Sequence, residues 1–123
     1  MSNFSESWEQ CMHGNGLPVP SVEDANEALE LMHKLHSAWE NAGGDEQMTI
    51  GALIALGALA GVDEGALVVL GEVAQVAAAL YISACIGCIA SVALDDLKNL
   101  FAENELPDFV VAELDGQGVD LVG

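Results

Sequence analysis

One segment of this chain, from Met48 to Leu94, consists almost entirely of Gly, Ala, Val, Leu and Ile, whereas the whole protein has a net charge of -18. An acidic tip, Asp63 and Glu64, divides the segment into two arms. Apolar stretches of about 18 residues or more can cross a bilayer as a helix, and shorter ones usually form buried core helices. The second arm is long enough to span a bilayer as a helix, and the first arm is close to the minimum length. We therefore predict an apolar helical hairpin, which is either the core of a small bundle or a membrane segment.

Length and charge narrow the possible classes of protein. The chain has 123 residues, of which 52% are hydrophobic, so it is expected to form one domain with a modest core rather than a disordered acidic tail. Twenty acidic residues face only two basic ones. Binding to a phosphate backbone needs Lys and Arg to displace counterions, so nucleic acid is not an expected partner.

The flanking parts of the chain show helical spacing of apolar residues. Phe4, Trp8 and Met12 share one face of a first helix. A second helix is predicted to begin with Ser21 as its N-cap and to stop at Gly43–Gly44. Its apolar face is formed by Val22, Ala25, Leu29, Met32, Leu35 and Trp39.

The C-terminal part is also expected to be helical. Leu94, Leu97 and Phe101 form a stripe beside acidic residues, and Pro107 can begin a last helix that runs through Leu114. The predicted fold class is all-α, a compact helical bundle with a central apolar hairpin. The single domain, 1–123, would comprise amphipathic helices in 1–47, the hairpin in 48–94, and an acidic C-terminal helix and tail in 95–123.

The hairpin contains small and polar residues at regular intervals. Gly57, Gly61 and Gly65 have the GxxxGxxxG spacing that lets two helix backbones touch, and Ala79 and Gly87 add small residues to the second arm. A stripe of polar residues follows at three- and four-residue steps, as an oligomeric pore would need. Its members are Glu72, Gln75, Ser83 and Ser91.

This arrangement resembles the hydrophobic hairpin of colicin-type pore-forming domains, and the glycine run resembles the glycine zippers of small membrane-acting effectors of bacterial type VI secretion. The resemblance covers only Met48 to Leu94 and is architectural. It implies a bacterial toxin that inserts into and depolarises a target membrane. Membrane lipid would then be its partner, and the inserted protein would form a homo-oligomer. A cognate immunity or chaperone protein is a further possible partner.

The acidic residues suggest how insertion would depend on pH. Carboxyl groups titrate near pH 4 in model peptides, so acidification to about pH 4 neutralises much of the charge. Protonation of Asp63, Glu64 and Glu72 would lower the cost of moving the hairpin into lipid. The first twenty residues lack a basic region and an apolar region, so no signal peptide is expected. The protein would be made in the cytoplasm and exported by a specialised route.

Other interpretations remain open. The same pattern fits a buried hairpin in a soluble bundle. An acidic immunity or adaptor protein that binds a basic partner is the alternative function, and an acidic surface adapted to high salt is a third interpretation. No phosphate loop, nucleophile elbow or HExxH motif is present, so no enzyme activity and no cofactor are expected.

The cysteines and histidines give weak signals. Three cysteines cannot all pair within one chain, so reduced thiols are expected, and Cys85 and Cys88 are interpreted as small hydrophobic residues rather than a redox pair. Cys11, His13, His33 and His36 could in principle meet around a metal, but their spacing matches no strong pattern. No metal site is therefore predicted.

Overall fold

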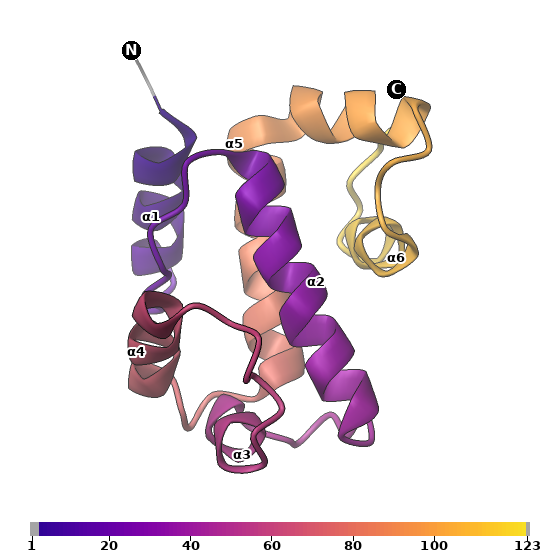
Figure 1. Ribbon diagram of the computed structural model, residues 1–123. Coiled ribbons are helices and arrows are strands. Elements are labelled where there is room, and N and C mark those ends of the chain that lie inside the picture. The colour runs from indigo at the N-terminus through magenta and orange to yellow at the C-terminus, as the bar shows by residue number, and fades with distance from the viewer. Residues whose placement is uncertain (1–2, 123) are drawn as a thin grey trace.

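The computed structural model describes residues 3–122, and in this part of the chain six helices are joined by short turns (Figure 1). The all-α class is confirmed. Only an isolated antiparallel bridge between Thr49 and Ala77 adds β-type pairing within the described residues. In chain order the helices are α1 (Phe4–Gly14), α2 (Ala25–Asn41), α3 (Ile50–Ala55), α4 (Glu64–Glu72), α5 (Ala78–Ala102) and α6 (Asp108–Gly116).

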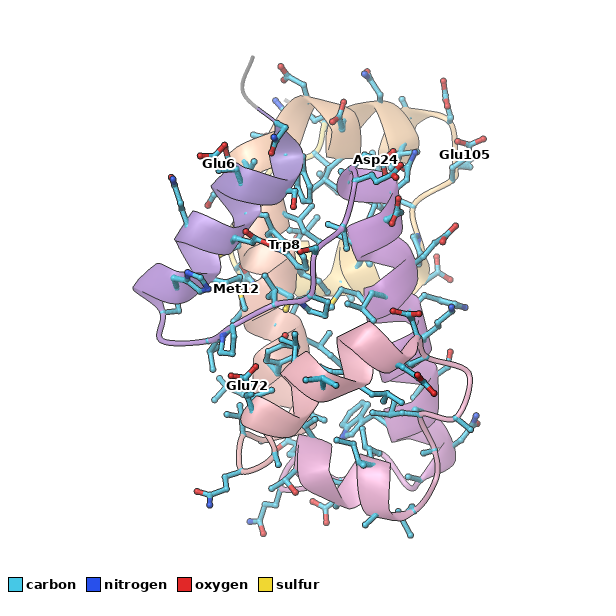
Figure 2. The ribbon with its side chains drawn as sticks, turned by 60° about the vertical axis from the view of Figure 1, so that its left-hand side comes forward. Glu6, Trp8, Met12, Asp24, Glu72 and Glu105 are labelled. Atoms are coloured by element: carbon cyan, nitrogen blue, oxygen red, sulfur yellow. A yellow bond between two sulfur atoms is a disulfide. The ribbon has the colours of Figure 1, made fainter. Side chains whose placement is uncertain are left out.

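Helix α5 is the centre of the fold, because α1, α2 and α6 all pack against it. Its side chains Tyr81, Ile86 and Ile89 are fully buried. From α1 the core receives Trp8 and Met12, which point toward α5 in Figure 2, while Glu6 points away. The predicted amphipathic face of the first helix therefore covers the apolar helix.

Helix α2 begins later than predicted. Its N-cap is Asp24, whose carboxylate accepts a hydrogen bond from the backbone N–H of Glu27 at 3.0 Å. Ser21 instead donates from its hydroxyl to the Glu9 carboxylate at 3.4 Å. An aspartate satisfies the free N–H groups at a helix start as well as a serine does, so both residues were possible caps. The end of α2 before Gly43–Gly44 is confirmed.

The apolar segment is not a two-armed hairpin, and this corrects the prediction. It forms three helices, α3, α4 and the first part of α5. Gly57 has a positive φ of 71°, so the backbone turns soon after α3. Asp63 then accepts a hydrogen bond from the N–H of Gly65 at 3.1 Å and starts α4. The second arm is broken again after Glu72.

The break between α4 and α5 has a structural partner in α3. The backbone N–H of Ile50 donates to the Val76 carbonyl, and that of Gly51 donates to the Ala74 carbonyl, both at 2.9 Å. The first N–H groups of a helix have no acceptor inside the helix. The turn at 73–77 therefore supplies the carbonyls that cap α3, and it could not do so as part of a continuous helix.

Helix α5 contains one residue outside helical geometry, Ala93, with φ -135° and ψ 43°. Before it the helix is apolar, and after it the helix is amphipathic and acidic, with Leu97 buried in the core. In Figure 1 the end of α5 turns across the top of the molecule. The predicted boundary at Leu94 thus lies beside a real bend.

Candidate functional site

Besides Val122 near the C-terminus, four large apolar side chains are exposed within residues 3–122, all from the apolar segment, and we call these four the apolar end. Ile54 is 37% exposed, Leu56 66%, Val68 70% and Leu80 61%. They come from α3 and the turn after it, from α4, and from the beginning of α5, which lie together in the lower half of Figure 1. No ionisable residue occurs between Ile50 and Val62. The part of the apolar end on α3 and the turn after it is therefore uncharged, whereas Val68 lies on α4 between the exposed Glu64 and Glu72.

Helix α5, with 25 residues, is the one helix within residues 3–122 that is long and apolar enough to cross a membrane. Of the residues in its most apolar window, 44% are buried inside the fold. Central helices of soluble proteins meet the same criterion of length and composition. Its three covers, α1, α2 and α6, lie on separate stretches of chain.

Helices α1 and α5 are joined by a disulfide between Cys11 and Cys88, with the Cα atoms 5.8 Å apart. The expectation of reduced thiols is therefore wrong for this pair. Close to the disulfide, the indole N–H of Trp8 donates to the Cys85 carbonyl at 3.2 Å, and the Asn15 amide donates to the Cys88 sulfur at 3.5 Å. The two cysteines are 77 residues apart in sequence, so only the packing of α1 on α5 brings them together.

Cys85 is the remaining free cysteine, and it is completely buried beside Tyr81. Burial raises the pKa of the Cys85 thiol well above its ordinary value. Burial, with a smaller effect of Cys85, likewise raises the pKa of the Tyr81 phenol, which donates to the Pro18 carbonyl at 2.8 Å. Cys85 therefore packs as a small hydrophobic residue, as predicted. The two cysteines of the CxxC sequence differ in state, because Cys85 is a free thiol and Cys88 is part of the disulfide.

Ser83, Glu113 and Gln117 form a polar seam between α5 and α6. The Ser83 hydroxyl donates to the Glu113 carboxylate. The Gln117 amide donates to the Ser83 carbonyl at 3.0 Å and to Glu113 at 3.1 Å. Gly87 adjoins the seam, because a Cβ there would lie 2.7 Å from the Gln117 amide oxygen. Ser83 and Gly87, which were predicted to act in the membrane, thus lie against α6. Their partners, Glu113 and Gln117, were not identified from the sequence.

The predicted polar stripe is not continuous in this fold. Glu72 ends α4 and Gln75 lies in the following turn, where both are exposed, so the break before α5 separates them from Ser83. Ser91 is exposed on α5. Ala79 lines a small cavity of about 100 Å³ between α2, α5 and α6. The four-residue spacing holds only inside α5, because a helical stripe requires an unbroken helix.

The three zipper glycines do not share a helix face either. Gly57 and Gly61 lie in the turn between α3 and α4, and Gly65 lies in the first turn of α4. The glycine that another backbone approaches closely is instead Gly51, where a Cβ would lie 2.9 Å from the Ala74 carbonyl oxygen. Nothing in the sequence sets Gly51 apart from the other glycines. Its role depends on the turn at 73–77, which packs against it.

The acidic tip and the histidines are also placed by the structure. Asp63 and Glu64 are exposed at the start of α4, with Asp63 as its N-cap. The possible metal ligands do not meet, since Cys11 is bonded to Cys88 and the His36 ring stacks on Phe109 with centroids 4.0 Å apart. Within residues 3–122, no three His, Cys, Asp or Glu side chains are grouped to hold a metal ion.

Comparisons with protein-family models, with curated proteins and with solved structures gave no match to this chain, so its function has to be inferred from its own residues.

Proposed function

We propose that this protein is a membrane-active bacterial toxin or effector. It folds in water around α5, meets the target membrane through the apolar end, and then inserts α5. The observation that supports this proposal most directly is the apolar end itself, whose exposed Ile54 and Leu56 lie in an uncharged stretch of a protein with a net charge of -18. Exposed apolar clusters of this kind commonly mark sites of interaction with proteins or membranes.

Contact through the apolar end is energetically reasonable. Full burial of a Val, Leu or Ile side chain contributes about 1.5 to 3 kcal/mol. The four side chains are 37 to 70% exposed, so their transfer into the acyl region would contribute several kcal/mol in total, on the order of half the full value for each. This gain needs no basic residues. It can therefore hold an acidic protein at a bilayer once the protein has been brought there.

Insertion of α5 requires a larger change. The apolar part from Ala78 to Val92 would be about 22 Å long at 1.5 Å per residue, and the hydrocarbon core is about 30 Å thick. Straightening at Ala93 would lengthen the apolar helix up to Asp95 and Asp96, which would then lie near the headgroups. Protonation of these two carboxyl groups would ease their approach to lipid. Acid should therefore promote insertion.

The test is leakage of an encapsulated dye from vesicles of phosphatidylethanolamine and phosphatidylglycerol, at neutral pH and at about pH 4. We expect leakage by the wild-type protein, with faster release in acid. Leu56→Glu places a charge in the apolar end and should reduce the rate by at least tenfold. Asn26→Glu, which adds the same charge at the exposed start of α2, is the matched control and should leak like the wild type.

A second variant asks whether the glycines act after insertion. No atom outside the local chain lies within 4 Å of a Cβ built at Gly61, so Gly61→Leu should fold normally in water. If residues 57–65 become one packed helix in lipid, this variant will bind vesicles but not permeabilise them. Leakage by Gly61→Leu at the wild-type rate would exclude the zipper. Absence of leakage by the folded wild-type protein at either pH, both with and without dithiothreitol, would exclude the membrane function.

The acidic surface favours one other function, an immunity or adaptor protein that binds a basic partner. Of the two lysines, Lys34 is exposed and Lys98 is half-buried, so little positive charge offsets the carboxylates. An acidic surface of this kind steers association with a basic protein and loses affinity as salt screens it. The apolar end is not needed for such binding, so Leu56→Glu would leave it unchanged.

A further inference from the structure

We propose that the Cys11–Cys88 disulfide is a redox latch. A thiol reductant opens it, α1 then separates from α5 while the other helices stay folded, and the uncovered face of α5 becomes available for insertion. Only the last step rests on the proposed membrane function. The opening of the latch is a property of the fold and can be measured without a membrane.

Helix α1 is attached to the rest of the molecule mainly through α5. The disulfide, the Trp8 hydrogen bond to Cys85 and the Asn15 hydrogen bond to Cys88 all connect these two helices. An isolated helix shorter than about 12 to 15 residues is marginal in water, and α1 has 11 residues. Once the covalent tie is lost, α1 is held by the burial of Trp8 and Met12 and by the two hydrogen bonds, without a covalent link.

The other helices have contacts that do not involve α1. Helices α2 and α6 pack on α5, and α3 packs on α4. The polar seam and the stack of Phe109 on His36 hold α6, and the Thr49–Ala77 bridge holds α3 to the turn before α5. Helix α1 can therefore separate from α5 while the contacts that hold α2, α3 and α6 in place are kept.

The structure indicates which sulfur is attacked. Cys88 is only 3% exposed, whereas Cys11 is half-buried near the surface. An external thiolate would attack the Cys11 sulfur, the S–S bond would break, and the electron pair would leave on the Cys88 sulfur, which then takes up a proton. The Asn15 amide, 3.5 Å from that sulfur, stabilises the departing thiolate. A second reductant thiol attacks the mixed disulfide at the reductant's sulfur and releases Cys11 as a thiol, so two reductant thiols become one disulfide.

Cys85 does not open the latch from inside, although it lies one helical turn from Cys88. It is completely buried, and burial raises the pKa of its thiol, so the nucleophilic thiolate is scarce. The disulfide therefore persists until an external thiol reaches Cys11. Reduction inside a target cell or by an added dithiol would supply that thiol.

The first experiment compares hydrogen exchange of the full-length protein, helix by helix, before and after reduction with dithiothreitol. We expect amides of α1 to exchange at least tenfold faster after reduction, with α2 and the first part of α5 still protected. Cys11→Ser should show the same exposed α1 without reductant. Cys85→Ala keeps the disulfide and should keep α1 protected. Unchanged protection of α1, or simultaneous loss of protection in every helix, would overturn the latch.

Vesicle leakage with the oxidised and the reduced protein separates the latch from the proposed function. Release of α1 together with leakage by the reduced form alone supports both. Release of α1 without leakage in either form supports the latch and overturns the membrane function. Equal leakage with the disulfide closed and open supports the membrane function and overturns the latch as its regulator.

The direction of attack has its own test. Asn15→Ala removes the donor to the Cys88 sulfur, so reduction by dithiothreitol should slow on the order of threefold. Gln10→Ala changes an exposed residue of α1 and is the matched control. An unchanged rate in Asn15→Ala would overturn the assignment of Cys88 as the leaving group.

Discussion

Gly51 shows how one residue without a side chain supports the apolar half of the fold. Its backbone N–H donates to the Ala74 carbonyl, and a Cβ at this position would lie 2.9 Å from that carbonyl oxygen and 3.1 Å from the Ala74 Cβ. The obstacle is backbone, which cannot rotate away as the end of a flexible side chain can. By contrast, Gly87 faces the end of the Gln117 side chain, which can move.

The substitution Gly51→Ala is expected to lower the free energy of unfolding by about 1 to 3 kcal/mol, the usual cost of forcing extra atoms into a packed site. Gly61→Ala is the matched control, because its Cβ would meet no neighbour within 4 Å. Chemical denaturation of the two variants beside the wild type gives both values. Equal stability of Gly51→Ala and Gly61→Ala would show that α3 and the 73–77 turn are not tightly packed.

At the scale of elements, α6 buries Val110 and Leu114 in the core and makes two further contacts of different kinds. The Phe109 ring stacks on His36 with an interplanar angle of 8°, and the polar seam joins Glu113 and Gln117 to Ser83. The helix has only nine residues, so it would not persist without these contacts. The amphipathic pattern predicts such a helix, but it does not say which surface the helix covers.

Replacement of Phe109 by Leu retains apolar volume and removes the aromatic stack, which contributes about 0.5 to 1.5 kcal/mol beyond the burial of its area. We expect amides of α6 to exchange several times faster in Phe109→Leu than in the wild type, with α1 unaffected. Ala112→Ser, at an exposed position of α6, serves as the control. Equal exchange in α6 would mean that the polar seam and the buried Val110 and Leu114 hold this helix without the aromatic stack.

At the scale of the whole molecule, the net charge of -18 acts against the apolar end. An anionic bilayer repels the protein, and the repulsion extends about 30 Å at 0.01 M salt but about 10 Å at 0.1 M. The disulfide also opposes insertion, because it holds the soluble form together. Closing a loop of this length stabilises a fold by about 4 kcal/mol in the chain-entropy treatment.

Binding to anionic vesicles at neutral pH should therefore become stronger as salt rises from 0.01 to 0.1 M, which is the reverse of the behaviour of a basic membrane-binding protein. Co-sedimentation with the vesicles at both salt concentrations measures this change, and neutral phosphatidylcholine vesicles provide the control. Binding to a basic protein would weaken over the same range. An affinity for vesicles that falls with salt would contradict contact through the apolar end.

Local patterns in the sequence determined the helical class, the buried face of α1, the end of α2 and the start of α6 near Pro107. These features depend on residues within a few positions of one another, so spacing and turn chemistry are sufficient to predict them. The apolar segment was predicted as two arms because its acidic tip gave the one clear break, and nearly uniform apolarity on either side does not mark where helices end.

Tertiary structure alone decided the remaining features. The Cys11–Cys88 pair, the polar seam and the capping of α3 by the 73–77 turn each join residues far apart in the chain. Such contacts form only when helices have packed, and many pairings are compatible with one sequence pattern. The dependence on distant contacts also explains why the predicted polar stripe is interrupted between α4 and α5. Its spacing was local, whereas the break in the helix was stabilised by hydrogen bonds from Ile50 and Gly51, more than twenty residues earlier in the chain.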